Sequence, residues 1–270
     1  MSLTEDQLRH FRAHGYVAVN DFWTPREVDA MRAELARLQQ EGLLRNVTTE
    51  GDGQTRSETR LNLQLCPMSP HSTLFRAMPF APRVVEAVQS LLGDPVVLHL
   101  DQVFLKPARH GAGTSWHQDN AYFQMDDPLM GTALWTAVHD ATVANGTLRI
   151  IPDAFATPLE HTRDPMSDHH IRCYPPEEGA IPIELPAGGA VFFAFGTPHS
   201  TGGNQTDHDR AGVALHFHNG RFPAENGFPP DKRVVLTGPE STGGQREYDT
   251  PVAGTWPAEV DRALAEAADG

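Results

Sequence analysis

The 270-residue sequence has few cysteines and no long apolar run. Cys66 and Cys173 are its only cysteines, too few for a disulfide framework or for a structural zinc site rich in thiolates. No stretch approaches the roughly 20 apolar residues that a transmembrane helix needs, and the first residues lack the basic and apolar segments of a secretion signal. We therefore expect a protein of the reducing cytoplasm that has no membrane partner.

Positive charge is also scarce, since 21 basic residues stand against 35 acidic ones and give a net charge of −14. Such a surface repels nucleic acid, anionic membranes and, less strongly, polyanionic thioesters. The acidity could instead serve solubility alone, because a local basic pocket can override the overall field. The charge excludes nucleic acid as the expected partner and favours a neutral or cationic small molecule over an acyl-CoA. No pattern in the sequence indicates an oligomeric state.

No linker divides the chain, so we expect one domain over residues 1–270. Within it, residues 1–95 are predicted to be mainly helical, residues 96–220 to form the β core, and residues 221–270 to be a C-terminal extension. A chain of this length can bury about three quarters of its unfolded surface in one core.

Three helices are predicted in the N-terminal part. Thr4 begins a capping box, and Gly15 ends the helix that follows. Thr24 caps a second helix, with Pro25 at its first position. A third helix runs from Pro82 to Leu92, with Gly93 as its stop. The second helix carries a core stripe at helical spacing, made of Val28, Met31, Leu35 and Leu38. The polar, glycine-rich stretch 48–54 between these helices is expected to be a surface loop or a mobile loop near the entrance.

Short segments of β-branched and aromatic residues follow, separated by Gly, Pro and Asn turns. The predicted strands are 96–98, 102–106, 134–138, 148–151, 189–193 and 213–217. Asn145-Gly146 is the strongest hairpin turn. This pattern predicts a mainly β jelly-roll of the cupin-like kind with flanking N-terminal helices.

A long polar insertion at residues 156–185 interrupts the strand pattern. Loops of this length in a compact domain are usually functional or disordered, so we predict a lid over the substrate pocket. His169-His170 within it could form a second metal site, but adjacent side chains point apart. His216 and His218 share a strand face, where a core or pocket histidine is favoured over a second ligand pair.

The motif His117-Gln118-Asp119 carries the clearest chemistry. On a β-strand, residues two apart point to the same face, so His117 and Asp119 would converge on one ion while Gln118 turns away. His199, from a distant strand, would complete a 2-His-1-carboxylate set, which leaves coordination positions open and is typical of non-haem Fe(II) oxygenases. The motif alone is a weak signal, because a chain with 14 histidines can contain such a spacing by chance.

Arg210 lies eleven residues after His199 and follows the polar loop 202–209. This arrangement predicts a hairpin in which His199 precedes the turn and Arg210 opens the return strand, as its neighbour. A guanidinium binds a carboxylate through two hydrogen bonds, which suits the distal carboxylate of 2-oxoglutarate. Thr201 would share a face with His199 and could donate its hydroxyl to the same carboxylate. Alternatively, Arg210 caps a sheet edge or pairs with a surface acid.

These motifs and their flanking segments resemble the phytanoyl-CoA dioxygenase family of Fe(II)/2-oxoglutarate oxygenases. Residues 134–142 resemble that family's tryptophan-bearing strand and aspartate, and Asn145-Gly146 resembles its turn before a return strand. The segment 188–193 resembles its glycine turn and apolar strand before the second histidine, and Gly15-Tyr16-Val17 fits its N-terminus. The similarity spans about the first four fifths of the chain, with the motifs in the family's order.

The resemblance implies a double-stranded β-helix with a metal and co-substrate site at its mouth. His117, Asp119 and His199 are implied as the Fe(II) ligands. Arg210 is implied as the partner of the C5 carboxylate of 2-oxoglutarate, with assistance from Thr201. Thr201 stands where serine is commoner in the family, a change that keeps the hydroxyl.

Further residues are implied less directly. Trp135 matches a tryptophan that lines the co-substrate pocket in the family, and Gln102 matches a residue that contacts 2-oxoglutarate. The stretch around Asn62 and Gln64 matches more loosely. Because the strand end after the metal motif opens toward the pocket, we predict four substrate contacts there: Asn120, Tyr122, Phe123 and Gln124.

The sequence can be compared with the family's pattern at two further places. The family commonly continues Gly-Ser-His after Ile151-Pro152, whereas this chain has Asp153-Ala154-Phe155, a departure that involves no ligand. Related halogenases replace the carboxylate ligand with a small residue, but this chain keeps Asp119, which favours oxidation over halogenation.

The implied function is an Fe(II)/2-oxoglutarate-dependent dioxygenase. It would convert 2-oxoglutarate and O2 to succinate and CO2 while it hydroxylates, desaturates, epoxidises or otherwise oxidises a small metabolite or natural product of bacterial type, and not an acyl-CoA. A non-oxidative metal-dependent jelly-roll enzyme would keep the three ligands but have no use for Arg210 and Thr201. A 2-oxoglutarate-binding sensor would bind both cofactors without turnover.

Overall fold

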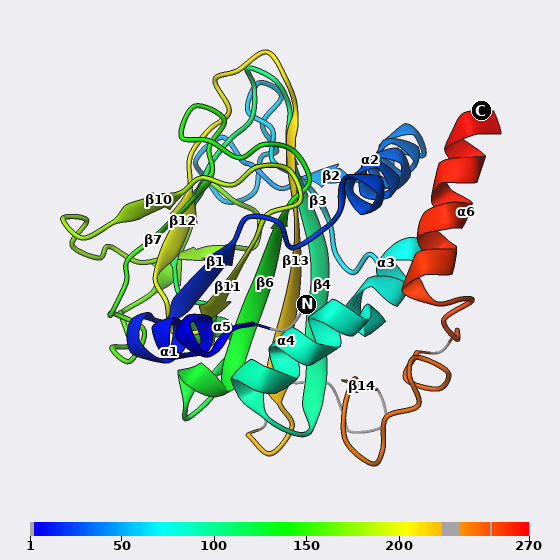
Figure 1. Cartoon of the computed structure of the whole chain (residues 1–270). Coiled ribbons are helices and arrows are strands. Elements are labelled where there is room, and N and C mark those ends of the chain that lie inside the picture. The colour runs from blue at the N-terminus through cyan, green and yellow to red at the C-terminus, as the bar shows by residue number, and fades with distance from the viewer. Residues whose placement is uncertain (1–2, 223–232, 249, 270) are drawn as a thin grey trace.

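The structure, a computed structural model, contains two main antiparallel sheets that pack face to face, and helices cover the outside of the larger sheet (Figure 1). A third sheet has only two strands, β8 (Thr162–Arg163) and β9 (Ile171–Arg172). The structure describes residues 3–222, 233–248 and 250–269. The larger sheet has the spatial order β1 (Tyr16–Val19), β11 (Ala190–Ala194), β6 (Gly131–Ala137), β13 (Arg210–Asn219), β4 (Val96–Lys106), β3 (Leu63–Leu65) and β2 (Arg45–Asn46), and β14 (Val234–Val235) pairs with β4.

The smaller sheet closes the other side of the barrel. Its strands lie in the order β10 (Ile181–Ile183), β7 (Leu148–Ile150), β12 (His199–Thr201) and β5 (Thr114–His117). A cluster of apolar side chains from both sheets fills part of the space between them, including Trp135 and Phe193 from the larger sheet and Ile150 from the smaller one. This architecture confirms the predicted jelly-roll with N-terminal helices.

The N-terminal helices form where their capping signals predict. Helix α1 (Glu5–His14) and helix α2 (Pro25–Gln40) each begin with a complete capping box, in which Thr4 and Thr24 accept a backbone N–H. Gly15 ends α1 in the left-handed region, at φ 77°, as a glycine readily does.

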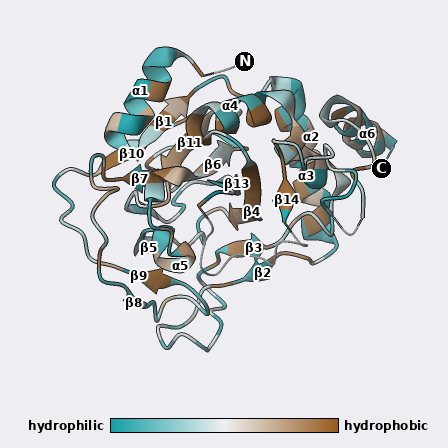
Figure 2. Cartoon of the chain, turned by 90° about the horizontal axis from the view of Figure 1, so that it is seen from below, coloured by the Kyte–Doolittle hydropathy of each residue, from teal (hydrophilic) through white to brown (hydrophobic). Residues whose placement is uncertain are grey.

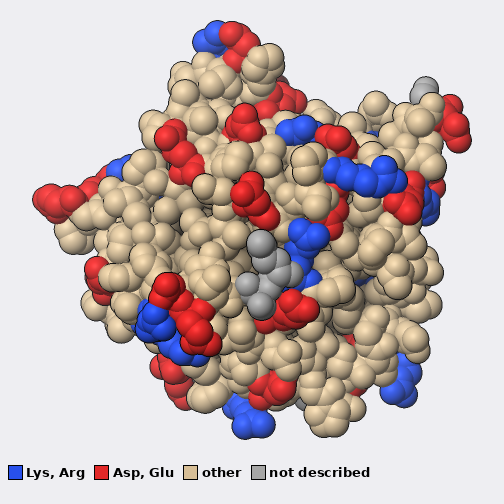
Figure 3. All heavy atoms as spheres, viewed as in Figure 1, with Lys and Arg blue, Asp and Glu red and all other residues tan. Residues whose placement is uncertain are grey.

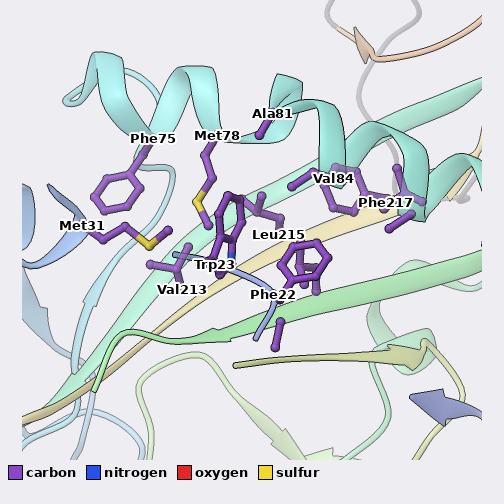
Figure 4. Close-up of a cluster of buried hydrophobic side chains, with 14 of the residues drawn as sticks. Phe22, Trp23, Met31, Phe75, Met78, Ala81, Val84, Val213, Leu215 and Phe217 are labelled. Atoms are coloured by element: carbon purple, nitrogen blue, oxygen red, sulfur yellow. The ribbon is translucent and has the colours of Figure 1, made fainter. Parts of the chain in front are cut away.

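A helical segment covers the outer face of the larger sheet. It consists of α3 (Thr73–Ala77), the 3₁₀ helix η1 (Met78–Phe80) and α4 (Pro82–Leu92), of which only α4 was predicted. Figure 4 shows Val213, Leu215 and Phe217 of β13 on the side of the strand that faces this segment. Alternation along β13 therefore divides it into an outer face for the main core and an inner face between the sheets.

The C-terminal extension adds α6 (Trp256–Asp269), which lies beside α2 at the edge of the molecule (Figure 1). The Trp256 ring lies 5.2 Å from the Trp23 ring, and its Nε1 donates to Oε1 of Glu27 at 2.6 Å. This helix was not predicted, and it extends the main core beyond the N-terminal helices.

The two predicted hairpins are wrong. The Asn145-Gly146 turn joins β6 to β7, and the loop 202–209 joins β12 to β13, but the members of each pair lie in different sheets. Both connections cross from one layer to the other instead of reversing the chain within one sheet. The strands predicted at 96–98 and 102–106 are one continuous strand, β4.

The surface and interior follow the expected division of polarity. Figure 2 shows hydrophobic colour concentrated on the central strands and hydrophilic colour on outer helical faces and loops. In Figure 3 acidic and basic side chains are interspersed on the visible face, without a broad basic area. Among the described helices, none combines the length and apolar character that a membrane crossing requires.

Candidate active site

Three side chains of the predicted metal site come together between the sheets. His117 ends β5 and His199 begins β12, and the two residues are direct partners in the antiparallel pairing of these strands. Oδ1 of Asp119 lies 3.8 Å from Nε2 of His117 and 3.7 Å from Nε2 of His199. One ligand atom from each residue falls within 4.8 Å of the other two, and all three residues are buried. This spacing suits a single ion.

Asp119 reaches the site by a different route from the one predicted. The strand ends at His117, and Asp119 has helical backbone angles at the start of the short helix α5 (Asn120–Phe123). A turn, and not strand alternation, therefore directs the carboxylate toward the histidines. Gln118 does turn away, and its Nε2 donates to the Gly196 carbonyl at 2.6 Å.

The backbone fixes the orientation of both imidazoles. Nδ1 of His117 contacts the carbonyl of Ser115 at 2.9 Å, and Nδ1 of His199 contacts the carbonyl of Thr197 at 3.0 Å. A carbonyl can only accept, so each Nδ1 carries the proton and each Nε2 presents a lone pair. Burial lowers the pKa of His117 to about 3 and also lowers that of His199, which keeps both rings neutral as metal ligands.

Asp119 is held as a buried anion. Burial alone would raise its pKa, but the imidazoles of His199, His216 and His117 outweigh this effect and lower it. Its Oδ2 lies 3.3 Å from Nε2 of His216 but lacks a hydrogen bond of normal geometry. A buried, ionised carboxylate whose oxygen lacks a hydrogen bond needs a cation beside it. Two neutral imidazoles and one carboxylate, with the rest of the sphere open, fit the donor set of a non-haem Fe(II) centre.

Arg210 lies at the start of β13 and is 1% exposed. Its guanidinium carbon is 5.5 Å from the centre of the Trp135 ring, and Nη2 donates to the Gly146 carbonyl. Gly212 makes room for this arrangement, since a Cβ at that position would lie 2.5 Å from Trp135 ring atoms. The alternatives of a sheet-edge cap or a surface ion pair do not apply, because Arg210 is inside the barrel.

Trp135 and Gln102 lie on the inner face on either side of β13, since Ala214 pairs with both. Oε1 of Gln102 accepts a hydrogen bond of 2.9 Å from Nε2 of Gln64. Asn62 is buried nearby, and its Nδ2 donates to Thr114 Oγ1 at 3.3 Å. The structure thus brings the loosely matched residues to the same wall as Gln102.

The four predicted substrate contacts divide into two groups. The Tyr122 ring lies 6.1 Å from the His117 ring, and the Phe123 ring lies 5.7 Å from the His216 ring. Asn120 uses its side-chain amide to close its own turn with Met125. Gln124 is exposed and has a positive φ of 53°. The arrangement brings the two aromatic side chains to the site but not Gln124.

The insertion 156–185 packs against the metal-site strand. The Gln118 backbone N–H donates to His161 Nε2 at 3.1 Å, and the Cys173 N–H donates to the Trp116 carbonyl at 2.8 Å. His170 is buried with its ring 5.9 Å from the His117 ring. Most of the loop 48–54 lies at the surface, as predicted, but Thr48 and Thr49 are buried against the insertion, and the Thr49 N–H donates to the Met166 carbonyl at 3.0 Å.

The sequence did not predict the contacts that His216 and Lys106 make at the site. His216 was interpreted only as a core or pocket histidine, yet it contacts the Asp119 carboxylate. No sequence motif marks Lys106, although it shares strand parity with Gln102 and therefore the inner face of β4. Its Nζ donates to Thr201 Oγ1 at 2.6 Å.

The amino-acid sequence is similar to those of known proteins. The chain matches the family described as Phytanoyl-CoA dioxygenase (PhyH) over residues 11–212. Ectoine dioxygenase of Bordetella parapertussis is 22% identical over 262 residues, covering 88% of this chain and 82% of the relative. Phytanoyl-CoA dioxygenase 1 of Oryza sativa subsp. japonica is 27% identical over 252 residues, covering 80% and 89%.

Solved structures share the fold. The non-heme alpha ketoglutarate dependent carbocyclase SnoK from nogalamycin biosynthesis superposes with a TM-score of 0.71 at 16% identity, covering 87% of this chain and 97% of that one. EctD from S. alaskensis with bound Fe superposes with a TM-score of 0.64 at 20% identity, covering 87% and 83%. Because the family match covers most of the sequence and all the candidate site residues, the chain belongs to the phytanoyl-CoA dioxygenase family of Fe(II)/2-oxoglutarate-dependent oxygenases, as the sequence predicted.

Proposed function

We propose that this chain hydroxylates a small molecule with Fe(II) held by His117, Asp119 and His199 and with 2-oxoglutarate held by Arg210 and Thr201. The observation that carries this proposal is the convergence of two neutral imidazoles and one anionic carboxylate beside a buried arginine. A non-oxidative jelly-roll enzyme would have no use for a buried cation at this place.

The protein contributes binding and orientation. Iron with 2-oxoglutarate and O2 supplies the oxidising power, and the products are succinate, CO2 and an oxidised substrate. Arg210 binds the distal carboxylate of 2-oxoglutarate, and the Trp135 ring beside it walls that part of the pocket. Thr201 donates its hydroxyl to the same carboxylate. Gln102, fixed by Gln64, lines the opposite side.

The surroundings of the site favour a neutral or cationic small substrate. The rings of Tyr122 and His170 lie near His117, and the ring of Phe123 lies near His216, which contacts Asp119. The chain carries a net charge of −14. Such a pocket and such a field disfavour an acyl-CoA with its several phosphates. Relatives named ectoine dioxygenase and a structure named for nogalamycin biosynthesis support a metabolite or natural product as the substrate class.

The insertion 156–185 is proposed to act as the lid of this pocket within a single domain. Its hydrogen bonds with Gln118 and Trp116 support this role, since closing such a segment beside the metal-site strand would exclude water from the reaction. Cys66 and Cys173 are unpaired, which supports the reducing cytoplasm as the location.

The proposal is tested by anaerobic titration with Fe(II) and 2-oxoglutarate, in which the visible charge-transfer band of the chelate is recorded. We expect a band that requires both reagents and is lost in Asp119→Ala. Arg210→Ala should weaken 2-oxoglutarate binding by 10-fold or more, on the order of one lost charge-assisted pair. Arg12→Ala, which removes an exposed arginine of α1, is the matched control.

A band of this kind would justify a screen of small molecules by succinate release. Tight Fe(II) binding without any band would overturn the proposal and leave a non-oxidative jelly-roll enzyme. A band with no turnover on any substrate would instead favour a sensor of 2-oxoglutarate.

A further inference from the structure

Two cations are buried side by side at one end of the inner face. Lys106 is the last residue of β4 and Arg210 the first of β13, and they are direct partners in the antiparallel register. Each is 1% exposed. Lysine and arginine are almost never buried to this degree unless they are paired.

Neither cation has an acidic partner among the residues that the structure describes. Burial lowers the pKa of Arg210 to about 10. Burial, and then the charge of Arg210, lower the pKa of Lys106 well below its usual value. No carboxylate of the described residues opposes these two pKa shifts. Two like charges buried together are costly, so the arrangement indicates an anion that arrives from outside the chain.

Thr201 connects Lys106 with the predicted carboxylate site. Its Oγ1 accepts one hydrogen bond from Lys106 Nζ at 2.6 Å and another from the Thr114 backbone N–H at 3.0 Å. A hydroxyl oxygen has two acceptor positions and one donor. Since both acceptor positions are occupied, the Thr201 O–H can only donate, and it is set in advance to bind an anion.

Lys106 is itself held in place. Its Nζ also donates to the Gly202 carbonyl at 2.5 Å, and Asn204 Nδ2 donates to the Lys106 carbonyl at 3.0 Å. The ammonium group therefore cannot swing out to solvent without loss of two hydrogen bonds. A fixed ammonium group can therefore hold the neighbouring Thr201 hydroxyl in the orientation that binds an anion.

We propose that Lys106 is a positioning residue of the co-substrate site. Lys106 orients the Thr201 hydroxyl, so that the distal carboxylate of 2-oxoglutarate binds both Arg210 and a hydroxyl group that is already directed to donate. This inference rests on the proposed use of 2-oxoglutarate. According to this inference, Lys106 makes the site select 2-oxoglutarate over a 2-oxo acid of the same chain length that has no second carboxylate.

The test compares 2-oxoglutarate with 2-oxopentanoate, whose terminal methyl group replaces the carboxylate. Binding of each acid to the Mn(II)-loaded protein is measured by calorimetry for the wild type and for Lys106→Met. We expect the Kd for 2-oxoglutarate to rise by about tenfold or more, as for loss of a hydrogen bond to a charged group. The Kd for 2-oxopentanoate should stay within about twofold, within the spread of a surface change.

A purely structural role for Lys106 would give a different result. Equal weakening of both acids, or no weakening of either, would overturn the inference. The Mn(II) affinity and the Tm of the unliganded variant check the fold, and neither should fall much, because the substitution removes an uncompensated buried charge. Failure of the wild type to bind 2-oxoglutarate would instead contradict the proposed function.

Thr201→Val supplies a second variant of nearly the same shape. It should lose affinity for 2-oxoglutarate but not for 2-oxopentanoate, and Lys106→Met should add less than about twofold in its background, since coupled residues are non-additive. A full further loss in the double variant would show that Lys106 does not act through Thr201. If Lys106→Met does not fold, Thr201→Val alone still tests the hydroxyl on which the inference depends, and an unchanged affinity of this variant for 2-oxoglutarate would overturn it.

Discussion

The co-substrate wall depends on small residues on the inner face of β13. Arg210, Gly212 and Ala214 alternate with outward-facing core residues, and the Trp135 ring crosses above Gly212. A glycine in a central strand normally weakens it, unless another group approaches closely. Here the approaching group is an indole that also contacts the Arg210 guanidinium, so the glycine serves the geometry of the site.

Replacement of Gly212 by alanine should disturb both stability and binding. The added Cβ would lie 2.5 Å from Trp135 ring atoms, so the ring must move away from Arg210. We expect a loss of about 1–3 kcal/mol in the free energy of unfolding, as for other overpacked sites, and weaker 2-oxoglutarate binding. Urea denaturation and calorimetry measure the two effects. Gly179→Ala is the control, because nothing lies closer than 4.0 Å to its added Cβ; equal behaviour of the two variants would contradict this reading of Gly212.

At the scale of elements, local signals predicted helices α1, α2 and α4, but not α3, α5 or α6. The capping threonines Thr4 and Thr24 and the stops at Gly15 and Gly93 act within one turn of chain, so the sequence contains their whole cause. Strand partners are different. Asn145-Gly146 has the composition of a hairpin turn, but whether the chain reverses within a sheet or crosses to the other sheet depends on distant strands.

The same contrast applies to the site. The ligand residues could be predicted because their spacing and the family resemblance point to them, whereas the geometry of Asp119 could not, since it depends on a turn after β5. Lys106 could be placed on the inner face by parity with Gln102. Its contact with Thr201 required the register between the sheets. Helix α6 was missed although Trp256-Pro257 precedes an alanine- and glutamate-rich run.

Helix α6 should be held to the fold chiefly by Trp256. This side chain is 4% exposed, packs against Trp23 and donates to Glu27. Trp256→Ala is expected to lower the free energy of unfolding by about 3 kcal/mol or more, in the range of large core truncations, as measured by urea denaturation. Ala265→Ser on an exposed position of the same helix is the control. An equally small effect of both variants would mean that α6 contributes little to the core.

For the whole molecule, the interior between the sheets is rich in neutral histidines. Burial, followed by the neighbouring His218 and His216, lowers the pKa of His99 to about 3. Burial lowers the pKa of His117 to about 3 and that of His170 well below its usual value. An interior built in this way suits metal binding and pocket walls near neutral pH, but it makes the metal-free fold sensitive to acid.

We therefore predict acid-labile folding of the metal-free protein. A histidine with a depressed folded pKa binds protons more readily when unfolded, so its contribution is complete above the unfolded pKa of about 6.5 and is lost as the pH falls toward the folded value. Between pH 7.5 and 5.5 the free energy of unfolding should fall by roughly 1 kcal/mol for each such histidine. Urea denaturation at the two pH values measures the fall. His99→Gln should make it smaller by about one histidine's share, whereas His208→Gln, at an exposed position, should leave it unchanged. A fall of the same size in both variants would show that acid acts elsewhere than on the buried rings.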